Sequence, residues 1–144
     1  MKLTTLRMVL LMVFTGLALL VAIPIAQATT ALGSQNPQLT VCASATSDGA
    51  NPDRATVGDT VAVASSVKNN TARARSVTIT YTLEDPTGRY QTHTETVRIG
   101  AHKTFDRSFS YIVDPSYPKG VYELTVSATN SRGTSSATAT LEIY

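Results

Sequence analysis

Acidic side chains surround one loop of the chain. Asp48, Asp53 and Asp59 border a stretch that also carries the turn-forming pairs Asp-Gly and Asn-Pro. Calcium prefers several oxygen ligands, and loops at the end of a sheet can supply them. The spacing does not match a helix-loop-helix calcium site, so we expect these carboxylates to cap turns, with calcium as the alternative. Asp48, Asp53 and Asp114 could perform acid-base chemistry if they met in space. A hydrolase rests on this possibility alone, so it is the least favoured hypothesis.

The chain has two histidines and one cysteine. A zinc site needs three or four ligands in fixed geometry, and no Cys or Glu stands at a ligand spacing from His93 or His102. We therefore expect both histidines on the solvated surface. Cys42 has no partner for an intramolecular disulfide. It is expected to be a small buried residue on a strand, or alternatively a thiol that pairs with another chain.

No pattern in the sequence indicates a catalytic centre. No serine lies in a G-x-S-x-G motif, and no histidine stands beside Cys42 as a base for a nucleophile. The sequence therefore predicts a protein that is not an enzyme. It predicts no catalytic residue, no cofactor-binding residue, no metal ligand and no cofactor.

Basic side chains gather at one connection, where Lys68, Arg73 and Arg75 lie close together in the chain. They could contact a phosphate or an acidic polysaccharide. The alternative is a solvated loop whose charges discourage edge-to-edge pairing of strands. The sequence has 12 basic and 10 acidic residues, but Lys2 and Arg7 lie in the N-terminal segment, so the remainder is balanced. This balance gives no reason to expect a nucleic-acid partner, which needs a clustered positive face.

The first 28 residues have the organisation of a secretory signal peptide. Positive charges precede the apolar run 8–25, and Ala26-Gln27-Ala28 follows with the small-x-small pattern of a signal-peptidase site. We therefore predict a signal peptide over residues 1–28, cleaved after Ala28, and a secreted or periplasmic protein. The apolar run is also long enough to span a bilayer, so the alternative is an uncleaved helix that anchors the protein. The membrane would be a partner only through this leader.

The rest of the chain divides into a short linker and one domain. Residues 29–37 are small and polar without periodicity, as in a linker, and residues 38–144 form the domain. Within the domain, apolar residues recur at every second position, which is the pattern of a strand with one buried face. The clearest run is 77–83. The expected strands are 39–45, 61–67, 77–83, 90–99, 105–113, 122–128 and 137–143.

Seven short strands with turns between them, and no helical period beyond the leader, indicate an all-β fold. We predict an immunoglobulin-like β-sandwich of about seven antiparallel strands, preceded by an N-terminal signal helix. The turn Asn130–Gly133 joins the last two strands. The Tyr122 hydroxyl could bond a nearby backbone group, as in a tyrosine corner, or Tyr122 could be an ordinary core residue.

Three segments of the chain carry a family resemblance. They are Ala55-Thr-Val-Gly-Asp-Thr-Val61, Val67-Lys-Asn-Asn-Thr-Ala-Arg-Ala-Arg-Ser-Val77 and Lys119-Gly-Val-Tyr-Glu-Leu-Thr-Val126. Together they resemble the CARDB type of bacterial and archaeal immunoglobulin-like module over residues 38–144. The last segment is shared with fibronectin type III-like domains, and Thr71 stands where the family has Gly. The resemblance implies an extracytoplasmic binding or spacer module and implies no functional residue.

These observations lead to a functional hypothesis. The leader, the alternating strands and the missing catalytic set indicate an exported, non-enzymatic immunoglobulin-like module. We expect it to contact protein or glycan at the cell envelope. The alternative is an accessory subunit of a larger extracellular or periplasmic assembly.

Overall fold

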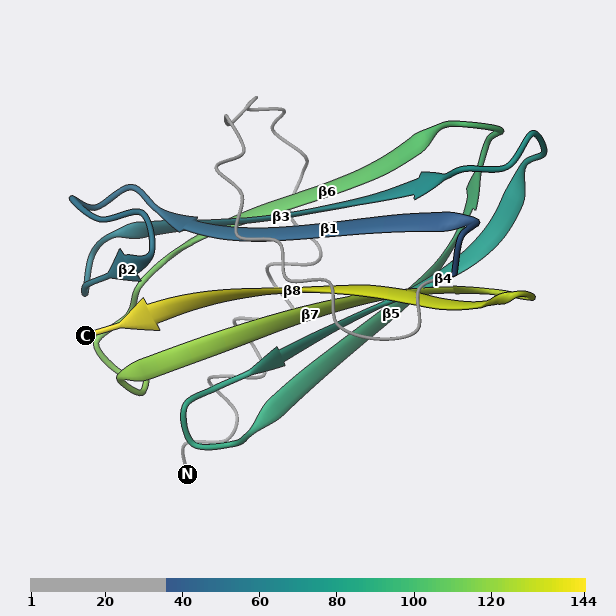
Figure 1. The fold of residues 1–144 in the computed structure, drawn as a ribbon. Coiled ribbons are helices and arrows are strands. Elements are labelled where there is room, and N and C mark those ends of the chain that lie inside the picture. The colour runs from purple at the N-terminus through teal and green to yellow at the C-terminus, as the bar shows by residue number, and fades with distance from the viewer. Residues whose placement is uncertain (1–35) are drawn as a thin grey trace.

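The computed structural model describes residues 36–144, and all of their regular structure is strand. The predicted signal peptide 1–28 and most of the linker lie outside the described residues. The strands form a three-stranded sheet, β1-β3-β6, and a five-stranded sheet, β2-β8-β7-β4-β5 (Figure 1). The strands are β1 (Leu39–Ser47), β2 (Arg54–Ala55), β3 (Thr60–Asn69), β4 (Arg75–Glu84), β5 (Tyr90–Ile99), β6 (Thr104–Ile112), β7 (Gly120–Asn130) and β8 (Gly133–Ile143).

The alternating pattern of the sequence becomes the two faces of the five-stranded sheet. On β4, Val77, Ile79 and Tyr81 are buried, whereas the threonines between them point to the outer face. β7 and β8 repeat this alternation, and β4 pairs with β7 so that Ile79 stands opposite Ala128. The predicted all-β class and the seven longer strands are therefore confirmed.

The core lies between the two sheets. One cluster joins Leu39, Val41 and Val67 of the three-stranded sheet to Ile79 and Val126 of the five-stranded sheet. A second cluster, around Val61, Val113 and Leu141, continues the core toward the end where β8 finishes. Because each cluster takes side chains from both sheets, the two sheets form one sandwich.

β2 is the strand that the sequence did not predict. It has only two residues, and it pairs parallel with β8, with Arg54 opposite Glu142 and Ala55 opposite Ile143. The Ala55 side chain is fully buried. A two-residue strand cannot show a period, so its position is fixed by pairing across the fold rather than by a local pattern.

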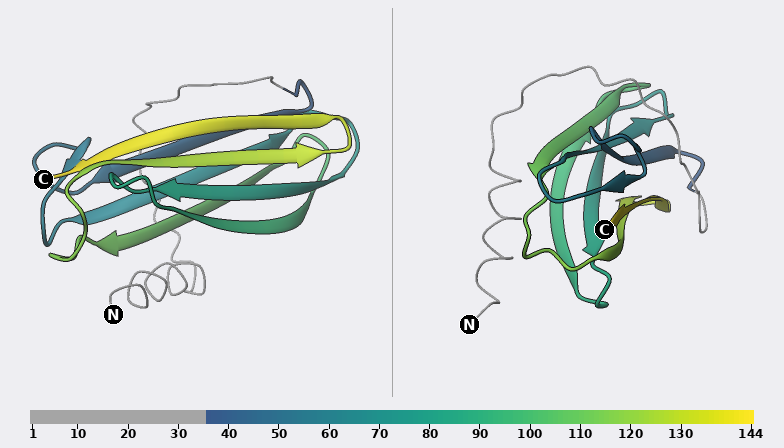
Figure 2. Two further views of the ribbon diagram at one scale, coloured as in Figure 1. Left: turned by 90° about the horizontal axis from the view of Figure 1, so that it is seen from below. Right: turned by 90° about the vertical axis from the view of Figure 1, so that its left-hand side faces the viewer.

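The strands run lengthwise, so their connections gather at two ends of the molecule (Figure 2). We call one the Asn36 end, because the described chain begins there and the connections 70–74, 100–103 and 131–132 lie there. We call the other the Tyr144 end. It holds the connections 48–53, 56–59, 85–89 and 113–119 together with the last residue.

Asn36, which the sequence assigned to the linker, is buried at the start of the described chain. Its side-chain Nδ2 donates to Asn130 Oδ1 at 2.8 Å and to the Gly133 carbonyl at 3.0 Å. Its backbone N–H donates to Ser135 Oγ at 2.9 Å. The Ser135 Oγ also lies 3.1 Å from the Leu39 carbonyl, which ties β8 to β1 across one side of the sandwich.

Tyr122 makes the bond expected of a tyrosine corner. Its hydroxyl donates to the Pro118 carbonyl at 3.0 Å, and burial raises its pKa to about 12. Gly120 begins the same strand with a φ of +133°, and a Cβ there would lie 2.7 Å from Pro86 Cβ. β7 therefore starts in close contact with the turn after β4.

Within residues 36–144, no helix is long and apolar enough to cross a bilayer.

Candidate functional site

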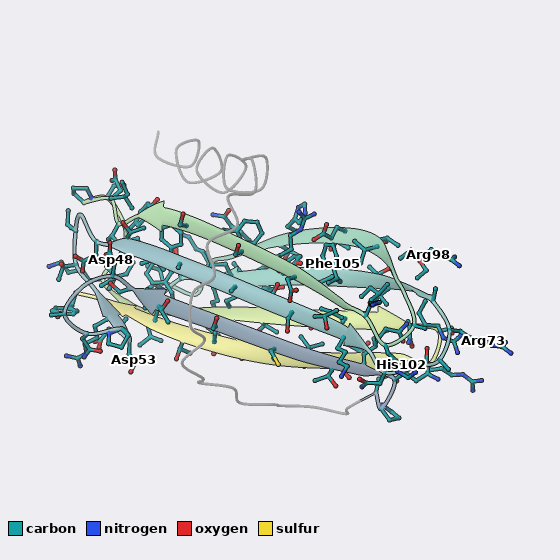
Figure 3. All side chains as sticks on the ribbon, turned by 90° about the horizontal axis from the view of Figure 1, so that it is seen from above. Asp48, Asp53, Arg73, Arg98, His102 and Phe105 are labelled. Carbon is teal, nitrogen blue, oxygen red and sulfur yellow. The ribbon has the colours of Figure 1, made fainter. Side chains whose placement is uncertain are left out.

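The Asn36 end brings basic side chains together from four separate segments. The sequence pointed to Lys68, Arg73 and Arg75 on one connection. The fold adds Arg98 near the end of β5, Lys103 in the turn before β6, and Arg132 in the turn between β7 and β8. Arg73, Arg98 and His102 lie toward one end of the molecule in Figure 3, and Asp48 and Asp53 lie at the other. Lys68, Arg73, Arg98, His102, Lys103 and Arg132 are exposed, and Arg75 is half-buried.

A buried asparagine fixes these connections relative to one another. Asn69 is 0% exposed, and its Nδ2 lies 2.8 Å from the Arg73 carbonyl, 3.1 Å from the Ile99 carbonyl and 3.0 Å from the Gly100 carbonyl. Its Oδ1 accepts from the Thr71 N–H and hydroxyl at 3.0 and 2.8 Å. The side chain therefore connects the β3–β4 connection to the β5–β6 turn. It is also enclosed, although Asn69-Asn70-Thr71 is a formal glycosylation acceptor by sequence.

The basic side chains of the Asn36 end have no acidic partners within residues 36–144. Residues 36–144 contain two ion pairs, Arg54 with Glu142 and Arg107 with Glu95, and neither involves the Asn36 end. The acidic residue nearest by register is Asp106, two positions along β6 from Thr104, which pairs with Lys68. The end therefore presents uncompensated positive charge, although the charges of the domain balance as a whole.

The acidic loop residues are at the opposite end, where turns use their carboxylates. Asp48 Oδ1 accepts from the Thr60 N–H at 2.6 Å. Asp59 Oδ2 accepts from the N–H and hydroxyl of Thr56, and Asp114 Oδ1 accepts from the Ser116 N–H at 2.8 Å. Residues 36–144 contain no group of three His, Cys, Asp or Glu side chains that could hold a metal. Asp48, Asp59 and Asp114 thus cap turns, the first two as the sequence indicated.

Asp85 is the acidic residue at this end that is most enclosed. Burial opposes ionisation of its carboxyl, but hydrogen bonds from Thr87 and Arg89 outweigh burial and lower the pKa of Asp85. Its Oδ1 accepts from the Thr87 hydroxyl at 2.6 Å and from the Arg89 N–H at 3.1 Å. These bonds close the turn between β4 and β5, so Asp85 serves structure.

The Tyr144 end also carries the large apolar side chains that remain exposed in the described domain. Tyr90 is 72% exposed at the start of β5, and Ile112 is 65% exposed at the end of β6. The Arg54 guanidinium lies 5.4 Å from the Tyr144 ring centroid and bonds Glu142 at 2.9 Å. The exposed apolar residues of this end are Val57, Tyr90, Ile112, Val121 and Tyr144.

Acidic residues lie beside two of these apolar side chains, Tyr90 and Val121, on the outer face of the five-stranded sheet. Glu84 stands opposite Tyr90 on one side and Glu123 on the other, and Val121 stands opposite Glu142. Opposed residues on neighbouring strands point to the same face. The Tyr144 end therefore combines exposed aromatic and aliphatic groups with negative charge.

A polar cluster closes the side of the sandwich where β5 and β6 are the free edges. Arg107 of β6 donates from Nε and Nη2 to the Glu95 carboxylate of β5, at 3.1 and 2.6 Å. The Tyr81 hydroxyl donates to the same carboxylate at 3.0 Å. The hydrogen bond from Arg107 is the main cause that lowers the pKa of Glu95, and burial raises the pKa of Tyr81 to about 12.

His93 differs from its sequence prediction. It is half-buried rather than solvated, and its ring centroid lies 6.1 Å from that of Tyr81. The reason is register: β5 pairs His93 with Tyr81, so the imidazole shares the inner face with the tyrosine. His102 is exposed, as predicted, and holds a positive φ of 56° in the β5–β6 turn.

Cys42 lies on a strand, as predicted, but is half-buried rather than buried. Its neighbours Val41 and Ala43 point into the core, so Cys42 takes the outer face of β1, opposite Ser66. The sequence interpretation rested on the burial habit of free cysteines and neglected the parity of the strand.

The outer face of the five-stranded sheet is lined by hydroxyl groups between the two charged ends. Threonine hydroxyls pair across strands, Thr78 with Thr96 at 3.2 Å and Thr80 with Thr94 at 3.2 Å. Thr125 and Thr138 continue the pattern between β7 and β8 at 3.3 Å. The middle of this face therefore carries no formal charge.

Comparisons with known proteins show likeness in fold alone. No protein family and no curated protein matches the chain by sequence. The C-terminal domain of wzt is similar with a TM-score of 0.55 and 12% identity, covering 81% of this chain and 78% of that chain. The Pseudomonas fluorescens alkylpurine DNA glycosylase AlkC bound to DNA gives a TM-score of 0.53 and 12% identity. That match covers 76% of this chain but only 31% of the glycosylase, so the chain spans less than a third of it.

A CARDB domain from Pyrococcus furiosus, in complex with di-metal ions, is also similar. It has a TM-score of 0.47 and 13% identity, and the match covers 78% of this chain and 92% of that chain. The first two likenesses support the sandwich fold alone. Membership of the CARDB family stays a proposal.

Proposed function

We propose that this protein is an exported, non-enzymatic binding module of the immunoglobulin-like, CARDB-like type, and that it acts at the cell envelope. The Tyr144 end is its contact surface. The leader sequence supports export, and the sandwich fold supports a module that presents loops at the ends of a rigid scaffold.

The observation that carries this proposal is the position of the exposed apolar side chains. Val57, Tyr90, Ile112, Val121 and Tyr144 all lie at one end, with Tyr90 and Val121 on the outer face of the five-stranded sheet and Ile112 on the outer face of the three-stranded sheet. Aromatic residues are enriched at protein interfaces, and clustered exposed apolar groups mark interaction sites. The acidic residues around them favour a protein partner with a basic rim, and a glycan that stacks on the tyrosines is the second candidate.

No catalytic step enters the proposal, because three of the acidic loop side chains at this end, Asp48, Asp59 and Asp114, are engaged in turns. Asp48, Asp59 and Asp114 accept hydrogen bonds from the backbone N–H groups of their own or neighbouring loops. A carboxylate that ends a turn is held by the fold and is poorly placed to move a proton on a substrate. Turnover of an ester, peptide or glycoside that survives purification and is lost in a single point variant would overturn this part.

Site-directed photo-crosslinking in whole cells tests the proposal. A photoreactive amino acid at Tyr90 or Tyr144 should capture envelope components, whereas the same group at Thr94 or Thr138, in the hydroxyl-lined face, should capture little. Tyr90→Ser and Val121→Ser should weaken capture by a probe at Tyr144, because they remove apolar contact area. Equal capture at all four probe positions would contradict a contact surface at the Tyr144 end.

The same experiment separates the two functional hypotheses. One dominant crosslinked protein indicates an accessory subunit of a larger extracellular or periplasmic assembly. A range of surface proteins indicates a general contact module. Crosslinked products that shift in mass after glycosidase treatment indicate a glycan partner.

A further inference from the structure

We propose that the Asn36 end is a membrane-docking surface that binds anionic lipid headgroups, so that the domain stands on the membrane with its Tyr144 end pointing away. This proposal does not depend on the identity of the partner at the Tyr144 end. It rests on the charge of one end and on where the chain enters the domain.

The charge of the Asn36 end suits a negatively charged surface. Exposed basic side chains from three connections and two strands project there, and none has an acidic partner within residues 36–144. Each Lys or Arg near an anionic membrane surface contributes about 1 kcal/mol of attraction. The network around Asn69 holds two of these connections, 70–74 and 100–103, together, so the backbone that carries Arg73 and Lys103 is fixed before binding.

The chain enters the described domain at this same end. Asn36 is bonded to the β7–β8 turn at the Asn36 end, and the apolar run finishes at Ile25. The stretch between these two residues spans at most about 40 Å when fully extended. When the leader stays uncleaved, which is the alternative to cleavage after Ala28, the basic end is therefore the end of the domain that is tethered within this distance of the headgroups.

An acidic polysaccharide would match the same charges, but lipid explains one more observation. A soluble polyanion could be bound by a basic patch anywhere on the domain. For a domain tethered by its leader, lipid docking requires the patch to lie where the tether enters the domain, and Asn36, the first described residue, lies at the basic end. The acidic Tyr144 end is then repelled from the same surface, which fixes the orientation.

The test uses the full chain, leader included, reconstituted into vesicles of phosphatidylcholine with or without phosphatidylglycerol. With Cys42→Ser as background, a fluorophore is attached at Ser131→Cys in the Asn36 end or at Ala50→Cys in the Tyr144 end. Both positions are exposed. A quencher on the lipid headgroup should quench the Ser131 label strongly in phosphatidylglycerol vesicles and less in pure phosphatidylcholine. The Ala50 label should be quenched in neither.

Two matched double variants separate docking from tethering. Arg73→Gln with Lys103→Gln removes two charges from the Asn36 end and should lower the docked-to-free ratio about 30-fold. Arg89→Gln with Lys119→Gln removes two charges from the Tyr144 end and should leave that ratio unchanged. Equal quenching of the Ser131 label in both lipids, or no effect of the first double variant, would overturn the proposal.

Two further measurements complete the test. Raising the salt concentration should release the Ser131 label, because exposed charges are screened within about 10 Å at 0.1 M ionic strength. Heparin serves as a polyanion without a membrane. Binding of heparin that depends on Arg73 and Lys103, together with no lipid-dependent quenching, would assign the surface to acidic polysaccharide and overturn the lipid proposal.

Discussion

Arg107 and Glu95 join the two sheets of the sandwich through two parallel hydrogen bonds on the side where the edge strands β5 and β6 do not pair. The Glu95 side chain is 17% exposed and the Arg107 side chain is 44% exposed, so the pair lies at the boundary of the core. The opposite side of the sandwich is connected by Ser135, whose hydroxyl lies between β8 and β1. Each open side thus has its own polar connection between the sheets.

We expect Arg107→Met to destabilise the domain by about 1 kcal/mol. A bidentate charged pair contributes more than a neutral hydrogen bond, but the exposure of Arg107 screens part of that gain. Chemical denaturation of Arg107→Met, Glu95→Gln and the double variant measures the coupling between the two side chains. Arg98→Gln, on the outer face of β5, is the matched control and should change stability little. A coupling energy of zero would show that the pair does not connect the sheets in solution.

Stability should fall as the solution is acidified below the ordinary pKa of glutamate. Hydrogen bonding from Arg107 holds the pKa of Glu95 below its usual value of 4.5 in the folded state. The contribution of Glu95 is therefore fully present above about pH 4.5 and is lost as the pH falls through the lowered folded pKa. Melting temperatures between pH 6 and pH 2 measure the slope. Glu95→Gln should flatten it in part, because Asp85 also has a lowered pKa.

Ile79→Ala should cost roughly 2–5 kcal/mol, because it removes packed methyl groups and leaves a cavity. Ile79 is fully buried between the sheets, opposite Ala128 of β7. Thr80→Ala on the outer face of the same strand is the control, and it should cost far less. The midpoint of urea unfolding reports both variants. An unchanged midpoint for Ile79→Ala would contradict the placement of this face in the core.

Asn36→Ala should destabilise the domain by about 1–3 kcal/mol, because the loss of its amide leaves buried partners unsatisfied. The side-chain Nδ2 donates to Asn130 Oδ1 and to the Gly133 carbonyl, and its Oδ1 accepts from the Gln38 N–H. Thermal unfolding of the variant measures the cost, and Ser131→Ala in the adjacent exposed turn is the control. A melting temperature equal to that of the unchanged protein would show that the first described residues do not belong to the folded unit.

The strands could be predicted because each carries its own pattern. The alternation along residues 77–83 fixes which side chains of β4 are buried, and the structure confirms it. The same period places Cys42 on the outer face of β1, and its expected burial was wrong because residue type was given more weight than position on the strand. It could not reveal β2, whose two residues pair only through β8.

The charged ends could not be predicted from local pattern. Lys68, Arg98 and Arg132 are far apart in the chain, and they share one end only because strands of similar length place every second connection there. Basic and acidic residues are equal in number over residues 29–144, so the net charge does not reveal how the two kinds are separated along the molecule. The link between Glu95 and Arg107 has the same origin, since it depends on two strands that belong to different sheets.

The hydroxyl-lined face has a consequence for how the two ends behave. A ten-residue strand rises about 33 Å, and the screening length at physiological ionic strength is about 8 Å. The basic and acidic ends are separated by several screening lengths of uncharged threonine surface, so neither end senses the field of the other. A partner bound at one end then leaves the electrostatic attraction at the other end unchanged. Each partner interacts with the charge of one end, and neither interacts with the zero net charge of the whole domain.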